Sequence, residues 1–180
     1  MDKRQELIET ATKLFSEKGF ENTALSEICE KAGVSKGLIS HHFKSKNGLL
    51  KEIFKRTTDL IVEMNQTSAK EKSPYVQLKA LIESFFIQLE ADKLFFQFNL
   101  NVIVQPNTRE ILKDLIMERS AFILQSTEGL FIKIDPKNSK VLSYLFIAEL
   151  DGIALNYLGI FDDYPLEEIK KQILKKYTKQ

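Results

Sequence analysis

Apolar residues recur every three or four positions through almost the whole chain, and this spacing constrains its fold more than any other feature. Side chains three or four residues apart lie on the same face of an α-helix, so the pattern gives each helix one apolar face. The first such face combines Leu7, Ile8, Ala11, Leu14 and Phe15. We find no persuasive run of alternating apolar and polar residues, the pattern of a half-buried strand. The sequence therefore predicts an all-α fold.

Glycine and proline divide the helical pattern into about nine predicted helices. Gly19 ends the first helix, and a helical hairpin follows at about residues 24–43. A fourth helix starts near Lys46 and ends in the polar stretch 66–72. Proline is tolerated in a first turn because its missing N–H would have no intrahelical partner there. The remaining segments, four of which begin at or just after a proline, are predicted near residues 74–90, 92–104, 107–128, 136–160 and 165–178.

The composition is that of a soluble globular protein. The 180 residues are 43% hydrophobic and 28% charged, which provides enough apolar material for a real core. No basic-then-apolar leader opens the sequence, and the most apolar segment, 141–158, is interrupted by Ser143, Glu149, Asp151 and Asn156. We therefore expect a soluble, cytoplasmic protein. The single cysteine, Cys29, cannot form an intrachain disulfide and falls on an apolar stripe, which favours a small core residue over a redox sensor.

Residues 23–46 predict two short helices joined by a tight turn. The apolar stripe of the first helix is formed by Leu25, Ile28, Cys29 and Ala32. Gly33 follows and can adopt the left-handed conformation that residues with a Cβ resist. The inward face of the second helix is formed by Val34, Leu38, Ile39 and Phe43. Ser35 stands before this helix as its predicted N-cap.

The other face of the second helix is polar and basic. It carries Lys36, Gly37, Ser40, His41 and Lys44. Between residues 31 and 56, seven cations accompany one anion, a charge of +6, whereas the whole chain carries +1. A short helix fits the major groove of B-DNA, and flanking lysines can hold the phosphates. This pattern indicates a surface that binds double-stranded DNA, with a merely solvated helical hairpin as the alternative.

The segment from Leu14 to Leu50 resembles the N-terminal domain of the TetR/AcrR family of bacterial transcriptional regulators. The resemblance rests on short matches taken together: Leu14-Phe15, Gly19-Phe20, Thr23, Ile28, Ala32-Gly33-Val34-Ser35, Lys36-Gly37, His42-Phe43, Lys44, Lys46 and Leu49-Leu50. It implies an all-α homodimer whose N-terminal helix-turn-helix domains enter successive major grooves of a palindromic operator. It also implies a C-terminal domain that binds a ligand and so alters the spacing of the DNA-binding domains.

On this basis we expect a three-helix DNA-binding domain at residues 1–56 and a larger helical domain for effector binding and dimerisation at residues 57–180. Repression is the commoner activity in the family, although these residues do not distinguish a repressor from an activator.

Nine residues are expected to contact DNA: Thr23, Ser35, Lys36, Gly37, Ser40, His41, His42, Lys44 and Lys46. The resemblance implies phosphate contacts for Thr23, His42 and Lys46, while Thr23 also suits a helix N-cap. A helix start beside a cation, as at Ser35 and Lys36, favours a phosphate because its backbone N–H groups are free.

Gly37, Ser40 and His41 are predicted to face the bases. Glycine inside a helix costs about 1 kcal/mol relative to alanine, so Gly37 either permits a close approach to DNA or is a simple surface residue. Many family members carry an aromatic residue at the position of Ser40, so the resemblance transfers no base preference. His41 and His42 point about 100° apart, unlike the i, i+4 histidines of zinc-binding helices, so no metal site is expected.

The C-terminal part is rich in phenylalanine and amides. The predicted helix 92–104 is apolar nearly all round, so it must be buried on most sides. Its neighbourhood also contains the amides Gln97, Asn99, Asn101 and Gln105. Buried amides need hydrogen-bond partners, which are either neighbouring helices or a bound ligand. For a small, largely apolar effector, the candidate pocket residues are Phe95, Phe96, Phe98, Asn99, Phe122 and Asp151.

Segments 136–160 and 165–178 predict half of a four-helix bundle formed across a two-fold axis. The candidate interface residues are Leu145, Ile153, Tyr157, Ile169 and Ile173. Glu149 and Asp151 interrupt the apolar pattern, and they either ring the edge of this interface or face a pocket.

Two other classes of function are compatible with parts of the chain. An enzyme is disfavoured, because the sequence contains no glycine-rich phosphate loop and no metal-spaced histidines, and no cofactor is expected. An architectural DNA-binding protein without an effector is the remaining alternative, and it would bind DNA without sequence preference.

Overall fold

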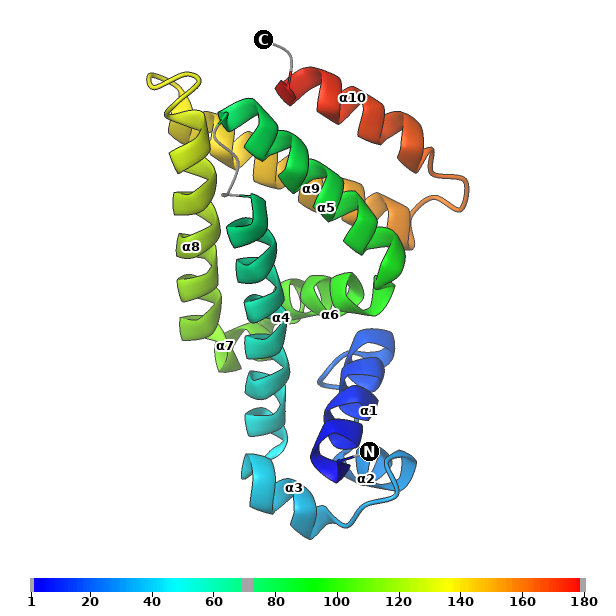
Figure 1. Cartoon of the computed structure of the whole chain (residues 1–180). Coiled ribbons are helices and arrows are strands. Elements are labelled where there is room, and N and C mark those ends of the chain that lie inside the picture. The colour runs from blue at the N-terminus through cyan, green and yellow to red at the C-terminus, as the bar shows by residue number, and fades with distance from the viewer. Residues whose placement is uncertain (1, 69–72, 179–180) are drawn as a thin grey trace. The chain divides into compact units, whose positions relative to one another are not determined.

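The computed structural model describes residues 2–68 and 73–178, with no account of the side chains at 67 and 68. These residues form ten α-helices and no strand, which confirms the all-α prediction (Figure 1). The helices are α1 (Lys3–Lys18), α2 (Leu25–Lys31), α3 (Lys36–Phe43), α4 (Lys46–Ser68), α5 (Pro74–Ala91), α6 (Lys93–Val104), α7 (Pro106–Ile111), α8 (Lys113–Phe131), α9 (Ser139–Gly159) and α10 (Leu166–Thr178). Part of the predicted polar linker, 69–72, lies outside the described residues.

One predicted helix is two in the structure. The segment predicted near 107–128 is divided at Leu112, whose backbone (φ −101°, ψ 4°) leaves the helical conformation between α7 and α8. Leu112 is fully buried in a hydrophobic core, and no proline or glycine marks this position in the sequence. The break between α7 and α8 therefore coincides with a leucine packed in the core, and no neighbouring residue signals it. The predicted count of nine helices was one too few.

The chain forms two compact units. The first contains the residues up to Asp59 together with Leu94–Met117, and the second contains Leu60–Lys93 and the residues from Glu118 onwards. The N-terminal stretch thus ends close to the predicted boundary at 56. However, α6 and α7, which the sequence assigned to the effector domain, belong to the first unit. The division of functions between the two parts stays a prediction.

The first unit is built around the apolar face of α1. All five residues predicted for that face are buried, and so are Ile28, Cys29 and Ala32 of the next stripe and turn. The segment 94–117 adds Phe98, Val102 and Leu112 to the same core. Burial of one such side chain contributes about 1.5–3 kcal/mol, so α6 and α7 are integral to this unit.

Two polar residues also join α6 to α1. The Asn101 amide donates to the carbonyl oxygens of Ser16 (2.7 Å) and Phe15 (3.3 Å), and the Ser16 hydroxyl donates to the carbonyl of Leu94 (2.9 Å). The last carbonyls of a helix have no intrahelical partner, so these bonds satisfy groups at the end of α1. A neighbouring helix, one of the two predicted alternatives, is thus the partner of the Asn101 amide.

The second unit contains α5 packed against α10 (Figure 1), with α8 and α9 supplying further core residues. The rings of Phe131, Phe146 and Tyr177 meet edge to face, with centroids 4.9–5.9 Å apart. The Tyr177 hydroxyl donates to a Glu149 carboxylate oxygen at 2.7 Å, and Lys176 pairs with the same carboxylate. Burial and this hydrogen bond raise the pKa of Tyr177 well above its ordinary value. Glu149 therefore anchors α10 to α9.

Among the described residues, α9 alone is long and apolar enough to cross a membrane by length and composition, a criterion that apolar helices of soluble proteins also meet. Its Phe146, Ile153 and Ala154 are buried within the unit.

Candidate DNA-binding surface

The hairpin of α2 and α3 has the geometry that its sequence predicts. Gly33 adopts a left-handed backbone (φ 60°), and the Val34 amide closes the turn by donating to the carbonyl of Cys29 at 2.9 Å. Ile39 and Phe43 of α3 are buried, while Val34 and Leu38 pack partly buried against the core. These apolar anchors fix which face of α3 is turned outwards.

The outward face of α3 holds most of the predicted DNA contacts. Its exposed residues are Ser35, Lys36, Gly37, Ser40, His41, His42 and, at the end of the helix, Lys44. Ser35 occupies the N-cap position with an extended backbone, as predicted, but its side chain makes no capping hydrogen bond. A Cβ at Gly37 would meet only Ser35 Oγ, at 3.6 Å. The protein itself therefore has no packing need for glycine at this position.

The two histidines lie side by side at the surface. Their ring centroids are 4.9 Å apart and the rings are inclined by 74°. In the part of the chain that the structure describes, no group of three or more His, Cys, Asp or Glu side chains is placed to hold a metal ion.

A tight turn joins α3 to α4. Lys44 has a positive φ (67°, with ψ −41°), and the Ser45 amide donates to the carbonyl of Phe43 at 2.8 Å, so the three residues form a γ-turn. Ser45 Oγ then accepts from the amide of Gly48 (3.1 Å), which caps the start of α4. A Cβ on Gly48 would lie 1.8 Å from the carbonyl oxygen of Phe43. Sequence reasoning missed both roles, although a serine just before a predicted helix start is a recognisable N-cap signal.

Lys46 is held in place by an aromatic ring. Its Nζ lies 4.2 Å from the centroid of Phe20, which is itself buried against Phe15. Burial lowers the pKa of Lys46, and the charge of Glu21 opposes this shift. The ammonium group is therefore a cation in a defined position at the start of α4, where free backbone N–H groups also favour an anion.

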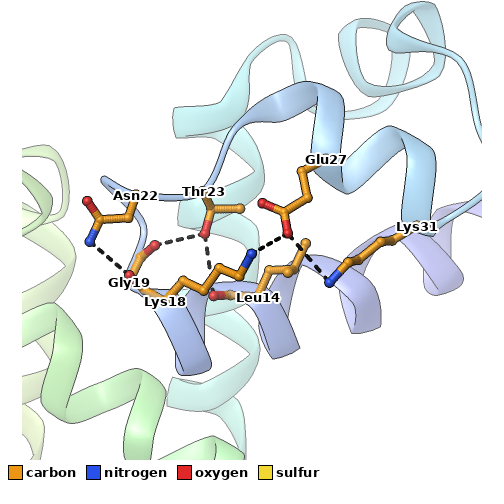
Figure 2. A network of polar contacts seen from close by, with 7 residues as sticks. All are labelled: Leu14, Lys18, Gly19, Asn22, Thr23, Glu27 and Lys31. Carbon is orange, nitrogen blue, oxygen red and sulfur yellow. Dashed lines mark hydrogen bonds and ion pairs between the residues drawn. The ribbon is translucent and has the colours of Figure 1, made fainter.

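Thr23 is the predicted contact that the structure contradicts. Its side chain is 1% exposed, and its hydroxyl donates to the carbonyl oxygens of Gly19 (2.8 Å) and Leu14 (3.4 Å), as Figure 2 shows. The residue at the N-cap position of α2 is Ala24, which makes no side-chain capping hydrogen bond. Both predicted roles for Thr23, phosphate ligand and helix N-cap, are therefore wrong, because the hydroxyl satisfies carbonyls at the end of α1.

Replacing Thr23 with valine, which has nearly the same shape, is expected to lower the free energy of unfolding by about 1–2 kcal/mol, because it removes a buried hydrogen bond. The salt dependence of DNA binding should not change. Urea unfolding and DNA titrations at several salt concentrations measure the two quantities. A salt slope that fell by about one, with unchanged stability, would restore Thr23 to the phosphate contacts.

Part of the basic charge is already paired within the protein. Glu27 accepts from Lys18 at 2.6 Å and lies 3.5 Å from Lys31, as Figure 2 shows. The hydrogen bond from Lys18 is the main cause of a lowered pKa at Glu27. Arg56 similarly pairs with Glu52 and donates to Gln5. The cations that remain on the outward face of the hairpin are chiefly those of α3 and the α3–α4 turn.

Comparison with known proteins agrees with this geometry. A family model described as bacterial regulatory proteins, tetR family, matches residues 7–53. The chain is 30% identical to the HTH-type transcriptional regulator BetI of Serratia proteamaculans (strain 568) over 146 residues, which are 73% of this chain and 74% of BetI. The chain belongs to the TetR family. It is a DNA-binding transcriptional regulator.

Solved structures of TetR-like regulators extend the similarity to the whole chain. A transcriptional regulator of the TerR/AcrR family from Aquifex aeolicus VF5 is 26% identical, has a TM-score of 0.75 and covers 97% of this chain and 96% of its own. FadR from Bacillus subtilis, solved in complex with stearoyl-CoA, has a TM-score of 0.80 at 18% identity and covers 97% of each chain. At that identity the second similarity concerns the fold alone.

The candidate pocket residues of this TetR-family chain are dispersed. Phe98 is 1% exposed in the core of the first unit, where α6 packs beside α1, and its role in a pocket stays a prediction. Phe95 is also buried, and the amide of Asn99 donates to the carbonyl of Phe95 one turn earlier on α6. Phe96 is half-buried. Sequence periodicity could not separate these residues, since α6 is apolar on most sides.

In the second unit, Phe122 lines a cavity. Asp151 of α9 is exposed as a residue, but burial of its carboxyl group raises its pKa. Of the candidate interface residues, Leu145 is 51% exposed, whereas Ile153 is 6% exposed and packs inside the unit. Ile153 is therefore wrong as an interface residue, because the neighbouring helices already cover it. Tyr157, Ile169 and Ile173 are half-buried, and Lys93 Nζ lies 4.9 Å from the Tyr157 ring centroid.

Proposed function

We propose that this TetR-family regulator is a homodimeric, cytoplasmic repressor that binds a palindromic operator and leaves it when a small-molecule effector binds the second unit. The observation that carries the proposal is the outward face of α3. It presents exposed polar and basic side chains together with a glycine that no internal contact requires, and Ile39 and Phe43 anchor the opposite face in the core.

The proposed contacts divide into two groups. Lys36, Lys44, Lys46 and His42 hold phosphates, and the free N–H groups at the start of α3 assist Lys36. Ser40 and His41 reach base edges in the major groove, where Gly37 allows the helix to approach closely. Ser35, whose hydroxyl makes no capping bond, is available to either group. Phosphate contacts supply affinity, and the few base contacts supply the sequence preference.

A dimer supplies the rest of the specificity. Positions 141, 145, 148 and 155 of α9 are spaced by four, three and seven residues, and all four side chains are exposed. Three of them are Val141, Leu145 and Leu155, and Tyr144 enlarges the same face. Exposed apolar stripes of this kind mark protein interfaces, and this spacing suits helix-to-helix packing across a two-fold axis. Two subunits would read half-sites about one helical turn, or ~34–36 Å, apart.

The experiment that tests this function is selection of bound fragments from random DNA by the purified protein at near-physiological salt. Recovery of a palindrome with half-sites about one turn apart is the expected result. Recovery of unrelated fragments that are all lost together as salt rises would overturn the proposal in favour of an architectural protein.

Lys46→Ala is expected to weaken binding about equally for all DNA sequences and to lower the slope of log affinity against log salt by about one, because one phosphate contact is lost. Titrations of the selected palindrome and of an unrelated duplex measure both effects. Lys79→Ala, an exposed lysine of α5, serves as the control and should leave the slope unchanged. An unchanged slope in Lys46→Ala would remove this residue from the phosphate contacts.

A further inference from the structure

The second unit contains an open cavity of about 330 Å³ between the C-terminal part of α4, the start of α5 and α8. Four amide side chains line it: Asn65 and Gln66 of α4, Gln77 of α5 and Gln125 of α8. Each amide can both donate and accept hydrogen bonds. The volume lies at the lower end of the range for small-molecule sites, so the cavity suits a ligand of metabolite size.

The α8 wall of the cavity carries an apolar side chain near each end, with Gln125, Ser126 and Gly129 between them, and a lysine follows the helix. Phe122 and Leu130 line it about 12 Å apart along the helix, by the rise of 1.5 Å per residue. Lys133 follows the end of α8, where its amide donates to the carbonyl of Leu130 at 3.2 Å. The cavity thus offers two separated apolar contacts, Phe122 and Leu130, with a positive charge one turn beyond the second.

The charged side chain that lines the cavity is positive. Lys133 is the only charged residue among the described residues that line the cavity, and no carboxylate is among them. Arg119 lies on the same face of α8, one turn before Phe122, and is mostly buried. Burial lowers its pKa to about 9, so it remains a cation at neutral pH. Glu128 lies about 200° around the helix from Ser126, on the opposite face.

We propose that this cavity is the effector site and that its ligand is a small amphiphilic anion, with a carboxylate bound near Lys133 and an apolar body against Phe122 and Leu130. The effector role rests on the proposed function, whereas the ligand class rests on the cavity alone. The amide groups of Gln66 and Gln125 donate to the carboxylate oxygens, and Lys133 adds a charge-assisted hydrogen bond, which is about twice as strong as a neutral one. The anionic group refines the prediction of a largely apolar effector.

Three probes with the same eight-carbon chain test the ligand class by isothermal titration calorimetry on the full chain: octanoate, octan-1-ol and octylammonium. We expect octanoate to bind about tenfold more tightly than octanol, and octylammonium to bind more weakly than either. Equal binding of the alcohol and the carboxylate, or preference for the ammonium, would overturn the proposal.

Variants then locate the site. Lys133→Gln is expected to weaken octanoate binding about tenfold and to leave octanol binding unchanged. Lys137→Gln, an exposed lysine four residues later that does not line the cavity, is the matched control. Gly129 lines the cavity and has no atom within 4 Å of its Cβ position, so Gly129→Leu should fill the space and abolish binding of both probes. Leucine favours a helix over glycine, so this variant should remain folded. Unchanged affinity in Lys133→Gln would overturn the proposed position of the carboxylate.

The two proposals can fail separately. If the chain selects a palindrome but does not bind octanoate, the ligand class is overturned and the DNA-binding proposal stands. If octanoate binds as described and does not release the palindrome, the ligand class is supported and the effector role is overturned.

Discussion

Replacing Gly19 with alanine is expected to lower the free energy of unfolding by about 3 kcal/mol. Gly19 ends α1 with φ 80° and ψ 154°, a backbone conformation that is open to glycine and costly for any residue with a Cβ. In addition, the new Cβ would lie 2.0 Å from the side-chain nitrogen of Gln105, so the end of this flexible side chain would have to move, at a smaller cost than the backbone strain. Urea unfolding followed by circular dichroism measures the change in stability.

Other glycines of the chain provide the matched controls. Gly33→Ala also meets a positive φ (60°) but has open space around its Cβ, so it should cost about 1–2 kcal/mol. Gly129→Ala lies within a helix in open space and should stabilise the protein by about 0.4–1 kcal/mol. Gln105→Ala in the Gly19→Ala background separates the two causes, because it removes the clash and leaves the strained backbone. Full recovery in that double variant would show that the clash, and not the conformation, carries the cost.

The parts of the fold that could be predicted are those set by neighbouring residues. The apolar stripe of α1, the turn at Gly33 and the outward face of α3 follow from spacing within one or two turns, and the structure has all three. The break at Leu112 could not be predicted, because no neighbouring residue signals it and Leu112 is buried among residues distant in sequence. Membership of α6 in the first unit depends likewise on Asn101 meeting carbonyl groups some 85 positions earlier in the chain.

The candidate DNA-binding site likewise has features set by neighbouring residues, which could be predicted, and features set by distant residues, which could not. Spacing on α3 identified which residues face outwards, because one helix carries both the anchors and the contacts. Thr23 and Lys46 lie outside that helix, and the sequence treated them alike. In the structure the Thr23 hydroxyl donates to the carbonyl of Gly19, just after α1, and is therefore not free to bind a phosphate. The Lys46 ammonium group instead lies over the Phe20 ring. Of the predicted pocket residues Phe122 lines the cavity of the second unit, whereas those of α6 could not be separated, since an apolar helix does not reveal which of its faces meets a cavity.

The double substitution Tyr144→Glu, Leu145→Glu is expected to convert the proposed dimer into a monomer and to weaken binding to the selected palindrome by about 100-fold or more. Both side chains are more than half exposed on α9, so the charges should not disturb the core of the unit. Placed in an interface related by a two-fold axis, four carboxylates would meet one another and lose hydration, which opposes association. A monomer reads one half-site, and it loses the gain in affinity that comes from linking two binding events.

Sedimentation measures the mass of the double variant in solution, and DNA titration measures its affinity for the palindrome. Ile87→Glu is the control, because it places the same charge on an exposed apolar residue of α5. It should leave both the mass and the affinity unchanged. The affinity of the double variant for a duplex with one half-site should match that of the original chain, because α3 is not altered. If the double variant remained a dimer with full affinity, the exposed face of α9 would not be the interface, and the half-sites would have to be joined through another surface.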